Sequence, residues 1–175
     1  GLPLSKRQTT DLEERYLAVY AKTVAENSPA TLDEKPATGL IHELLKHAAE
    51  RSRAKFLDTR TELSDGQRRL KVDGVKALPL LDGDRQRIDA MWQPLVASSG
   101  NPTFFQILDA ARRIAGTGSL GVERYVILVA GKGSPDGNYL LDLKRAVPSS
   151  LPKAKKATSI HWSSQAERVV KMQST

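Results

Sequence analysis

The chain has 175 residues, of which 39% are hydrophobic and 27% are charged. This balance is typical of globular proteins and excludes a wholly disordered or collagen-like chain. Because the chain has no cysteine, thiolate metal centres, thiol nucleophiles and disulfides are excluded. Lys and Arg outnumber Asp and Glu by 27 to 20, and the formal net charge of +7 favours an anionic partner.

The sequence carries no sign of membrane insertion or export. No apolar run approaches the roughly 18 residues that a membrane span requires, and residues 1–7 lack the apolar segment of a secretory signal. We therefore expect a cytoplasmic protein without a membrane partner. Its first residue is Gly rather than Met, which indicates either a residue left by a tag or a piece of a longer chain.

Two amphipathic helices are predicted first. Apolar side chains recur at helical spacing within residues 10–27, and Thr10 with Glu13 forms a capping box at the start. A second helix is expected at residues 39–57, with its apolar side chains on one face.

Short elements follow these helices. Strands are predicted at residues 69–72 and 75–81, the second at a sheet edge because it contains Pro79. A helix is expected at residues 85–92, with its end set by Pro94.

The domain boundary is expected near residue 100. Asn101 and Pro102 form an N-cap and first-turn signal, which predicts a helix at residues 103–111. We expect residues 1–100 to be mainly helical and residues 101–175 to contain a sheet.

The last part of the chain predicts this sheet. Strand patterns occupy residues 112–115, 124–130 and 138–144, and the Gly-rich residues 131–137 predict a hairpin between the last two. A helix is predicted from residue 163 or 164 to Gln173. The expected fold class is α+β, a helical N-terminal part followed by a small antiparallel sheet with a packed helix.

A glycine motif lies between two of these strands. Residues 116–121 match G-x-G-x-x-G, which occurs in dinucleotide-binding folds before a helix and in kinases between two strands. Because residues 125–129 are aromatic and β-branched, they favour a strand and therefore the kinase arrangement. The predicted nucleotide-binding residues are Gly116, Thr117, Gly118, Ser119, Gly121 and Lys144.

Lys144 is the candidate phosphate-binding lysine because it ends the strand that follows the hairpin. Strand alternation places Leu140, Asp142 and Lys144 on one face. Glu167, in the last helix, is the candidate that orients this lysine, with the neutral Gln173 as a weaker alternative. A structural glycine turn and a surface ion pair are the competing interpretations.

Other motifs favour non-catalytic interpretations. His42 and His47 are one residue too far apart for the H-E-x-x-H zinc motif, and we assign no metal ligand and no catalytic residue. The basic cluster Lys153, Lys155 and Lys156 permits an alternative function. In that alternative the chain is a non-catalytic nucleic-acid-binding or adaptor module with a structural glycine loop.

Four segments carry a resemblance to a known family: residues 113–121, residues 125–128, residues 141–146 and residues 167–173. Together they resemble an uncharacterised bacterial family, domain of unknown function 2252, whose fold looks kinase-like; the specific match covers residues 111–173. The resemblance implies a fold like a protein-kinase N-lobe, ATP and Mg as cofactors, and phosphoryl transfer to an unknown acceptor. The family motifs D-x-H-x-x-N and N-D-F-D do not occur here, so the metal ligands and catalytic base are expected outside this chain. The oligomeric state stays open.

Overall fold

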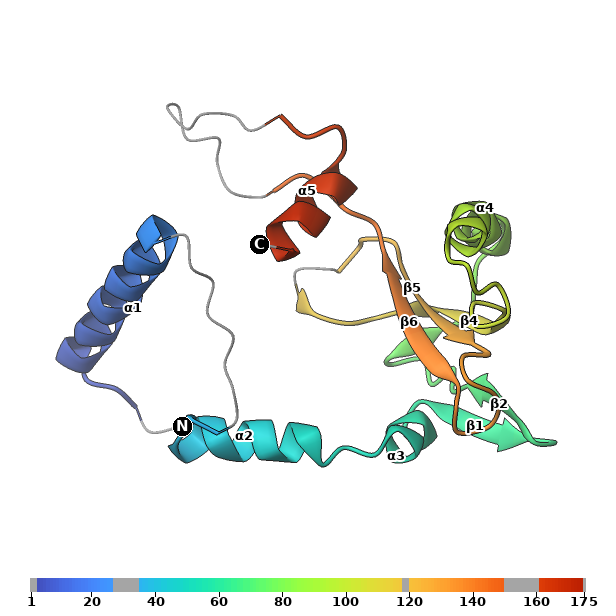
Figure 1. Cartoon of the computed structure of the whole chain (residues 1–175), viewed down its shortest axis with the longest axis horizontal. Coiled ribbons are helices and arrows are strands. Elements are labelled where there is room, and N and C mark those ends of the chain that lie inside the picture. The colour runs from blue at the N-terminus through green and yellow to red at the C-terminus, as the bar shows by residue number, and fades with distance from the viewer. Residues whose placement is uncertain (1–2, 27–34, 118–119, 150–160, 175) are drawn as a thin grey trace. The chain divides into compact units, whose positions relative to one another are not determined.

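A computed structural model describes residues 3–26, 35–117, 120–149 and 161–174, and it shows a mixed α+β chain (Figure 1). The elements in chain order are α1 (Lys6–Glu26), α2 (Gly39–Ala49), α3 (Arg53–Asp58), β1 (Thr61–Ser64), β2 (Gln67–Leu70), β3 (Ala77–Leu78), α4 (Asp84–Ser98), β4 (Ile107–Arg113), β5 (Arg124–Val129), β6 (Tyr139–Lys144) and α5 (Gln165–Gln173). Contacts group residues up to 49 in one compact unit and residues 50–173 in another. The boundary expected near residue 100 therefore falls inside the second unit.

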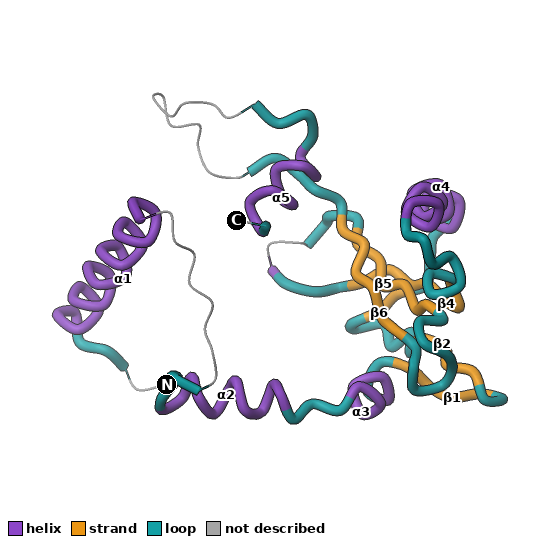
Figure 2. The backbone as a smooth tube through the Cα atoms, viewed as in Figure 1, coloured by secondary structure: helices purple, strands orange, loops and turns teal. Residues whose placement is uncertain are grey.

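The first unit holds α1 and α2, which Figure 2 shows with the other helices in purple. α1 begins before the predicted capping box. Gln8 N donates to Ser5 Oγ over 3.3 Å, and Ser5 N donates to Gln8 Oε1 over 2.9 Å, so this pair caps the helix. Thr10 lies inside the helix and donates to the Lys6 carbonyl oxygen. No described helix is long and apolar enough to cross a membrane.

The single helix predicted at residues 39–57 is wrong, because α2 and α3 are separate helices. Ser52 interrupts the helix with an extended backbone, and its side chain accepts a hydrogen bond from Lys55 N as the N-cap of α3. A residue that caps a new helix cannot also continue the old one. α3 buries Leu57.

The strand predicted at residues 69–72 is displaced by two residues, because β2 is the second strand of a hairpin with β1 and starts right after its turn. β1 and β2 pair antiparallel, with Thr61 opposite Leu70. Asp65 and Gly66 form the turn with φ of 50° and 75°, the left-handed pair that tight hairpins require.

The main sheet has four antiparallel strands in the order β3-β4-β5-β6. β5, β6 and the hairpin that joins them confirm the prediction. The edge position expected from Pro79 is also confirmed, since β3 is an edge strand and Pro79 follows it directly.

The helix predicted at residues 103–111 is wrong, because residues 107–113 form β4. Asn101 Oδ1 accepts a hydrogen bond from Phe104 N, and Gln106 N donates to the Thr103 carbonyl oxygen. The capping signal therefore produces one turn only. From residue 107 the backbone pairs with β5 instead of continuing a helix, because long-range strand pairing overrides local helix propensity.

The end predicted for α4 at Pro94 is also wrong, because α4 continues to Ser98. Proline removes one hydrogen bond to the carbonyl four residues earlier, which belongs to Ala90. Both Ala90 and Pro94 are exposed, so water can solvate that carbonyl group. The extra turn places Val96 against the core.

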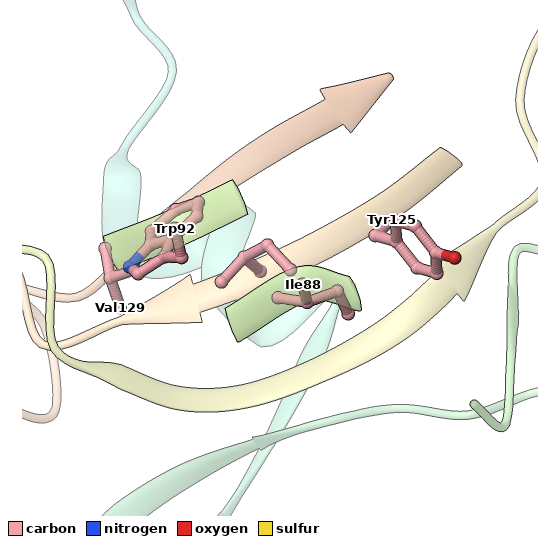
Figure 3. Packing of buried hydrophobic residues seen from close by; sticks show 5 residues of the cluster. Ile88, Trp92, Tyr125 and Val129 are labelled. Carbon is pink, nitrogen blue, oxygen red and sulfur yellow. The ribbon is translucent and has the colours of Figure 1, made fainter. Parts of the chain in front are cut away.

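Two clusters of side chains pack on opposite faces of the sheet. On one face, Ile88 and Trp92 of α4 pack against Tyr125, Ile127 and Val129 of β5 (Figure 3). On the other face, Leu70, Ala77, Ala111 and Leu128 form a second cluster beneath the β1–β2 hairpin. We call this second side the hairpin face. The predicted alternation of β6 is confirmed, since Leu140 packs with the hairpin-face cluster and Leu141 with the α4 cluster.

Candidate functional site

The glycine loop, residues 114–123, joins β4 to β5. Gly116 and Gly121 have φ of 73° and 77°, and no atom lies within 4 Å of a Cβ placed at either residue. The positive φ angles favour glycine at both positions, whereas the surrounding space would admit a side chain. Thr117 is exposed. The other two loop candidates, Gly118 and Ser119, lie outside the described residues.

Arg124 holds the two ends of the loop in place. Its Nη1 donates to the Ala115 carbonyl oxygen over 2.9 Å, before the motif, and its Nε donates to Asp142 Oδ1 over 2.8 Å on β6. One half-buried guanidinium thus links β5 to the start of the loop and to β6.

Three cations lie side by side across the sheet next to this loop. Arg112 pairs with Tyr125, which sets Arg113 beside Arg124, and Arg124 pairs with Lys144. Strand alternation puts all three side chains on the hairpin face. We call Arg113, Arg124 and Lys144 the cationic row.

A single carboxylate lies within the cationic row. Asp142 Oδ2 lies 3.1 Å from Arg113 Nη1 and also pairs with Arg124 Nη2. The hydrogen bond from Arg124, and then the charges of Arg113, Arg124 and Lys144, lower the pKa of Asp142 below its ordinary value. Asp142 is therefore ionised at neutral pH, and two positive charges of the row remain uncompensated within it.

A pocket of about 290 Å³ borders the glycine loop. Loop residues Ala115, Leu120 and Gly121 form part of its wall, and Arg113 and Arg124 bring two cations of the row to it. Lys144 instead lines a neighbouring pocket of about 210 Å³. The structure therefore brings one predicted loop glycine together with four arginines that the sequence did not single out: Arg113 and Arg124 of the row, and Arg87 and Arg112.

The floor of the pocket is a buried polar group. Asp84 is 1% exposed and accepts hydrogen bonds from Leu81 N over 2.7 Å and Tyr125 Oη over 2.8 Å. These bonds and the Arg87 guanidinium hold the pKa of Asp84 below its ordinary value although burial opposes this. Burial, and then the hydrogen bond to the same carboxylate, raise the pKa of Tyr125. Asp84 thus joins α4 to β5 below the loop.

Glu167, the predicted partner of Lys144, caps its own helix in this structure. Its Oε2 accepts hydrogen bonds from Ser163 N over 2.8 Å and Ser163 Oγ over 2.6 Å, and these bonds lower its pKa. Across the described ranges no ion pair joins Lys144 to Glu167. α5 is tied to the end of the sheet by Arg168, whose Nη2 donates to the Val147 carbonyl oxygen.

The sequence predicts no metal ligand but contains a basic cluster. In the part of the chain that the structure describes, no group of three or more His, Asp or Glu side chains could hold a metal ion. Lys153, Lys155 and Lys156 lie outside the described residues.

Arg113 and Arg124 could have been found from the sequence. Each lies three residues outside the glycine motif, one on either side. In antiparallel strands such positions face each other across a symmetric loop. The missing information was the register, which the misplaced helix at residues 103–111 concealed.

A family comparison covers nearly the whole chain. The model of one protein family, described as "Uncharacterized protein conserved in bacteria (DUF2252)", matches residues 5–175. No curated protein and no solved structure matches. The match includes the helical residues before the sheet, beyond residues 111–173, which carried the resemblance in the sequence.

Proposed function

The chain belongs to the DUF2252 family of bacterial proteins, and we propose that its glycine loop and cationic row bind the phosphate groups of a nucleotide such as ATP. In this proposal β4, β5, β6 and α5 correspond to the N-lobe of a kinase-like phosphotransferase that acts in the cytoplasm. The acceptor stays open, and no metal ligand or catalytic base is assigned to this chain.

The pocket that unites Gly121 with Arg113 and Arg124 carries the proposal. Guanidinium groups bind phosphate oxygens through two parallel hydrogen bonds. Glycines without side chains allow backbone N–H groups to approach the same oxygens closely. The positive charge of the row that Asp142 does not compensate attracts the negative charge of a polyphosphate.

Lys144 and Glu167 complete the proposed site. Lys144 stands at the end of the cationic row and contacts the phosphates once a nucleotide extends beyond the pocket. Glu167 orients Lys144 after exchanging its bonds with Ser163 for the ammonium group. Mg²⁺, which accompanies ATP, neutralises further phosphate charge.

Calorimetric titration of Mg-ATP into the full chain tests the proposal. We expect Lys144→Ala to weaken binding about tenfold, the effect of losing one charge-assisted contact. The control is Lys132→Ala, which removes an exposed lysine from the turn between β5 and β6 and leaves the affinity unchanged. Equal affinity of both variants would show that the site assignment is wrong.

The same titration separates the nucleic-acid alternative. A single-stranded oligonucleotide replaces Mg-ATP, and the salt concentration is varied. Binding that weakens steeply with salt, without any binding of Mg-ATP, would overturn the proposal and favour a basic adaptor module with a structural glycine loop.

A further inference from the structure

A second pocket lies on the hairpin face of the sheet, and its lining combines apolar and charged side chains. Its volume is about 190 Å³. Leu70 and Ala77 are buried at its base, and Val126 of β5 and Leu140 of β6 line it together with Phe56 of α3. An apolar cavity of about 150 Å³ accommodates one benzene ring, so this pocket has room for a body of that size.

Four cations stand around these apolar walls: Arg60, Lys71, Lys76 and Arg113. Two of them are already engaged, since Lys71 Nζ donates to the Asp58 carbonyl oxygen over 2.6 Å and Arg113 pairs with Asp142. Arg60 is half-buried and Lys76 is exposed. Among the residues that the structure describes, neither of these two side chains has an ion-pair or hydrogen-bond partner.

The one carboxylate in the pocket wall is engaged by the backbone. Asp73 Oδ1 accepts hydrogen bonds from Val75 N over 2.9 Å, Lys76 N over 2.6 Å and Ala77 N over 3.0 Å. These bonds use the carboxylate to build the turn that carries Lys76. The pocket thus combines apolar walls with two cations that are available to a ligand.

We propose that this pocket binds a small molecule in which an apolar body of about one ring carries a phosphate or carboxylate group. The ring contacts Val126, Leu140 and Leu70, and the anion lies between Arg60 and Lys76. Apolar walls with a few well-placed polar groups are the usual composition of small-molecule sites. This site uses residues of α3, β2 and β3 and does not depend on nucleotide binding at the glycine loop.

Titration of the full chain with phenyl phosphate and with benzoate tests the site. Calorimetry measures the affinity, and two-dimensional NMR of the ¹⁵N-labelled chain locates the contact through the amide signals of Leu70, Ala77, Val126 and Leu140. Binding of either anion with shifts at these amides supports the proposal, and the stronger of the two identifies the preferred group. Absence of binding by both anions overturns it.

Three comparisons make the test specific. Arg60→Gln and Lys76→Gln should each weaken binding of the preferred anion about tenfold, whereas the control Lys132→Gln leaves it unchanged. Benzyl alcohol, which has the ring without the charge, should bind at least about tenfold more weakly. If Lys144→Ala weakens the anion as much as Arg60→Gln does, the probe occupies the glycine loop and this proposal is wrong. Mg-ATP is titrated in a separate experiment. If the chain binds no Mg-ATP, the titrations with phenyl phosphate and benzoate still test the pocket on the hairpin face.

Discussion

Arg68 Nη2 donates a hydrogen bond of 2.8 Å to Asp136 Oδ1, across 68 residues of sequence. The same guanidinium donates from Nη1 to Asp58 Oδ1 and from Nε to the Pro135 carbonyl oxygen, each over 2.7 Å. Its side chain is 4% exposed. One buried cation therefore joins the β1–β2 hairpin to α3 and to the turn between β5 and β6.

The first prediction concerns this buried cation. We expect Arg68→Gln to lower the free energy of unfolding by about 2 kcal/mol, because it removes several buried charge-assisted hydrogen bonds. Asp58 and Asp136 are 64% and 66% exposed, so water solvates them after the change and the loss stays moderate. Urea denaturation measures the effect.

The matched control is the next residue along the strand. Arg69 is exposed, and among the described residues its side chain donates one hydrogen bond, to the Leu108 carbonyl oxygen. Arg69→Gln should cost less than about 1 kcal/mol. Equal losses in the two variants would mean that the Arg68 contacts contribute nothing beyond those of a surface arginine.

The second prediction tests the cationic row. Arg113→Gln should weaken Mg-ATP binding about tenfold, because Arg113 is on the row and borders the pocket at the glycine loop. Arg112→Gln is the comparison, since Arg112 borders the same pocket from the α4 face, so the two variants show from which face the phosphates are bound. If Arg112→Gln weakens binding more than Arg113→Gln, the phosphates bind on the α4 face.

The third prediction concerns the carboxylate within the row. Asp142→Asn keeps the shape of the side chain and removes its charge, so the row gains one net positive charge. Mg-ATP should bind about threefold more tightly, with a steeper dependence on salt. The free energy of unfolding should fall by about 1 kcal/mol, since Arg124, whose side chain is 15% exposed, loses its ionic partner.

Asp89→Asn provides the comparison for Asp142. It removes a half-buried carboxylate that pairs with Arg85 on α4, away from the row. Its effect on Mg-ATP affinity should be negligible. Weaker nucleotide binding by Asp142→Asn would indicate that Asp142 serves mainly to position Arg124 at the loop.

β5 and β6 could be predicted because their sequences carry the signal locally. Residues 125–129 are continuously apolar, and a Gly-rich hairpin joins them to residues 139–144, which are paired in the structure. The segment at residues 101–113 could not be predicted in this way. Its N-cap signal is real but ends after one turn, because β5 offers a long-range partner that outweighs the local preference.

In the candidate site, too, local sequence patterns predict some residues, whereas others come together only through strand pairing. The spacing of Gly116 and Gly121, and the position of Lys144 at a strand end, follow from nearest-neighbour patterns. The assembly of Arg113, Arg124 and Asp142 depends on the register of three strands. The pocket on the hairpin face is still less accessible to sequence reasoning. Its cations come from separate places in the chain: Arg60 follows α3, Lys71 follows β2, Lys76 precedes β3 and Arg113 ends β4.

The last prediction concerns the pH dependence of stability at the Asp73 turn. Three backbone N–H groups lower the pKa of Asp73 from 3.8 to about 2 in the folded chain. A depressed carboxylate pKa stabilises the fold at pH values above the unfolded pKa, and this contribution is lost as the pH falls toward the folded pKa.

Asp73→Asn retains a side-chain acceptor for the turn but cannot titrate. The difference in free energy of unfolding between the original chain and Asp73→Asn should therefore stay constant above about pH 5 and shrink between about pH 4 and pH 2. Urea denaturation across this range measures it, with Asp82→Asn, an exposed carboxylate of a nearby turn, as the control. Curves that remain parallel for the original chain and Asp73→Asn would show that this turn does not bind the ionised carboxylate more tightly than the unfolded chain does.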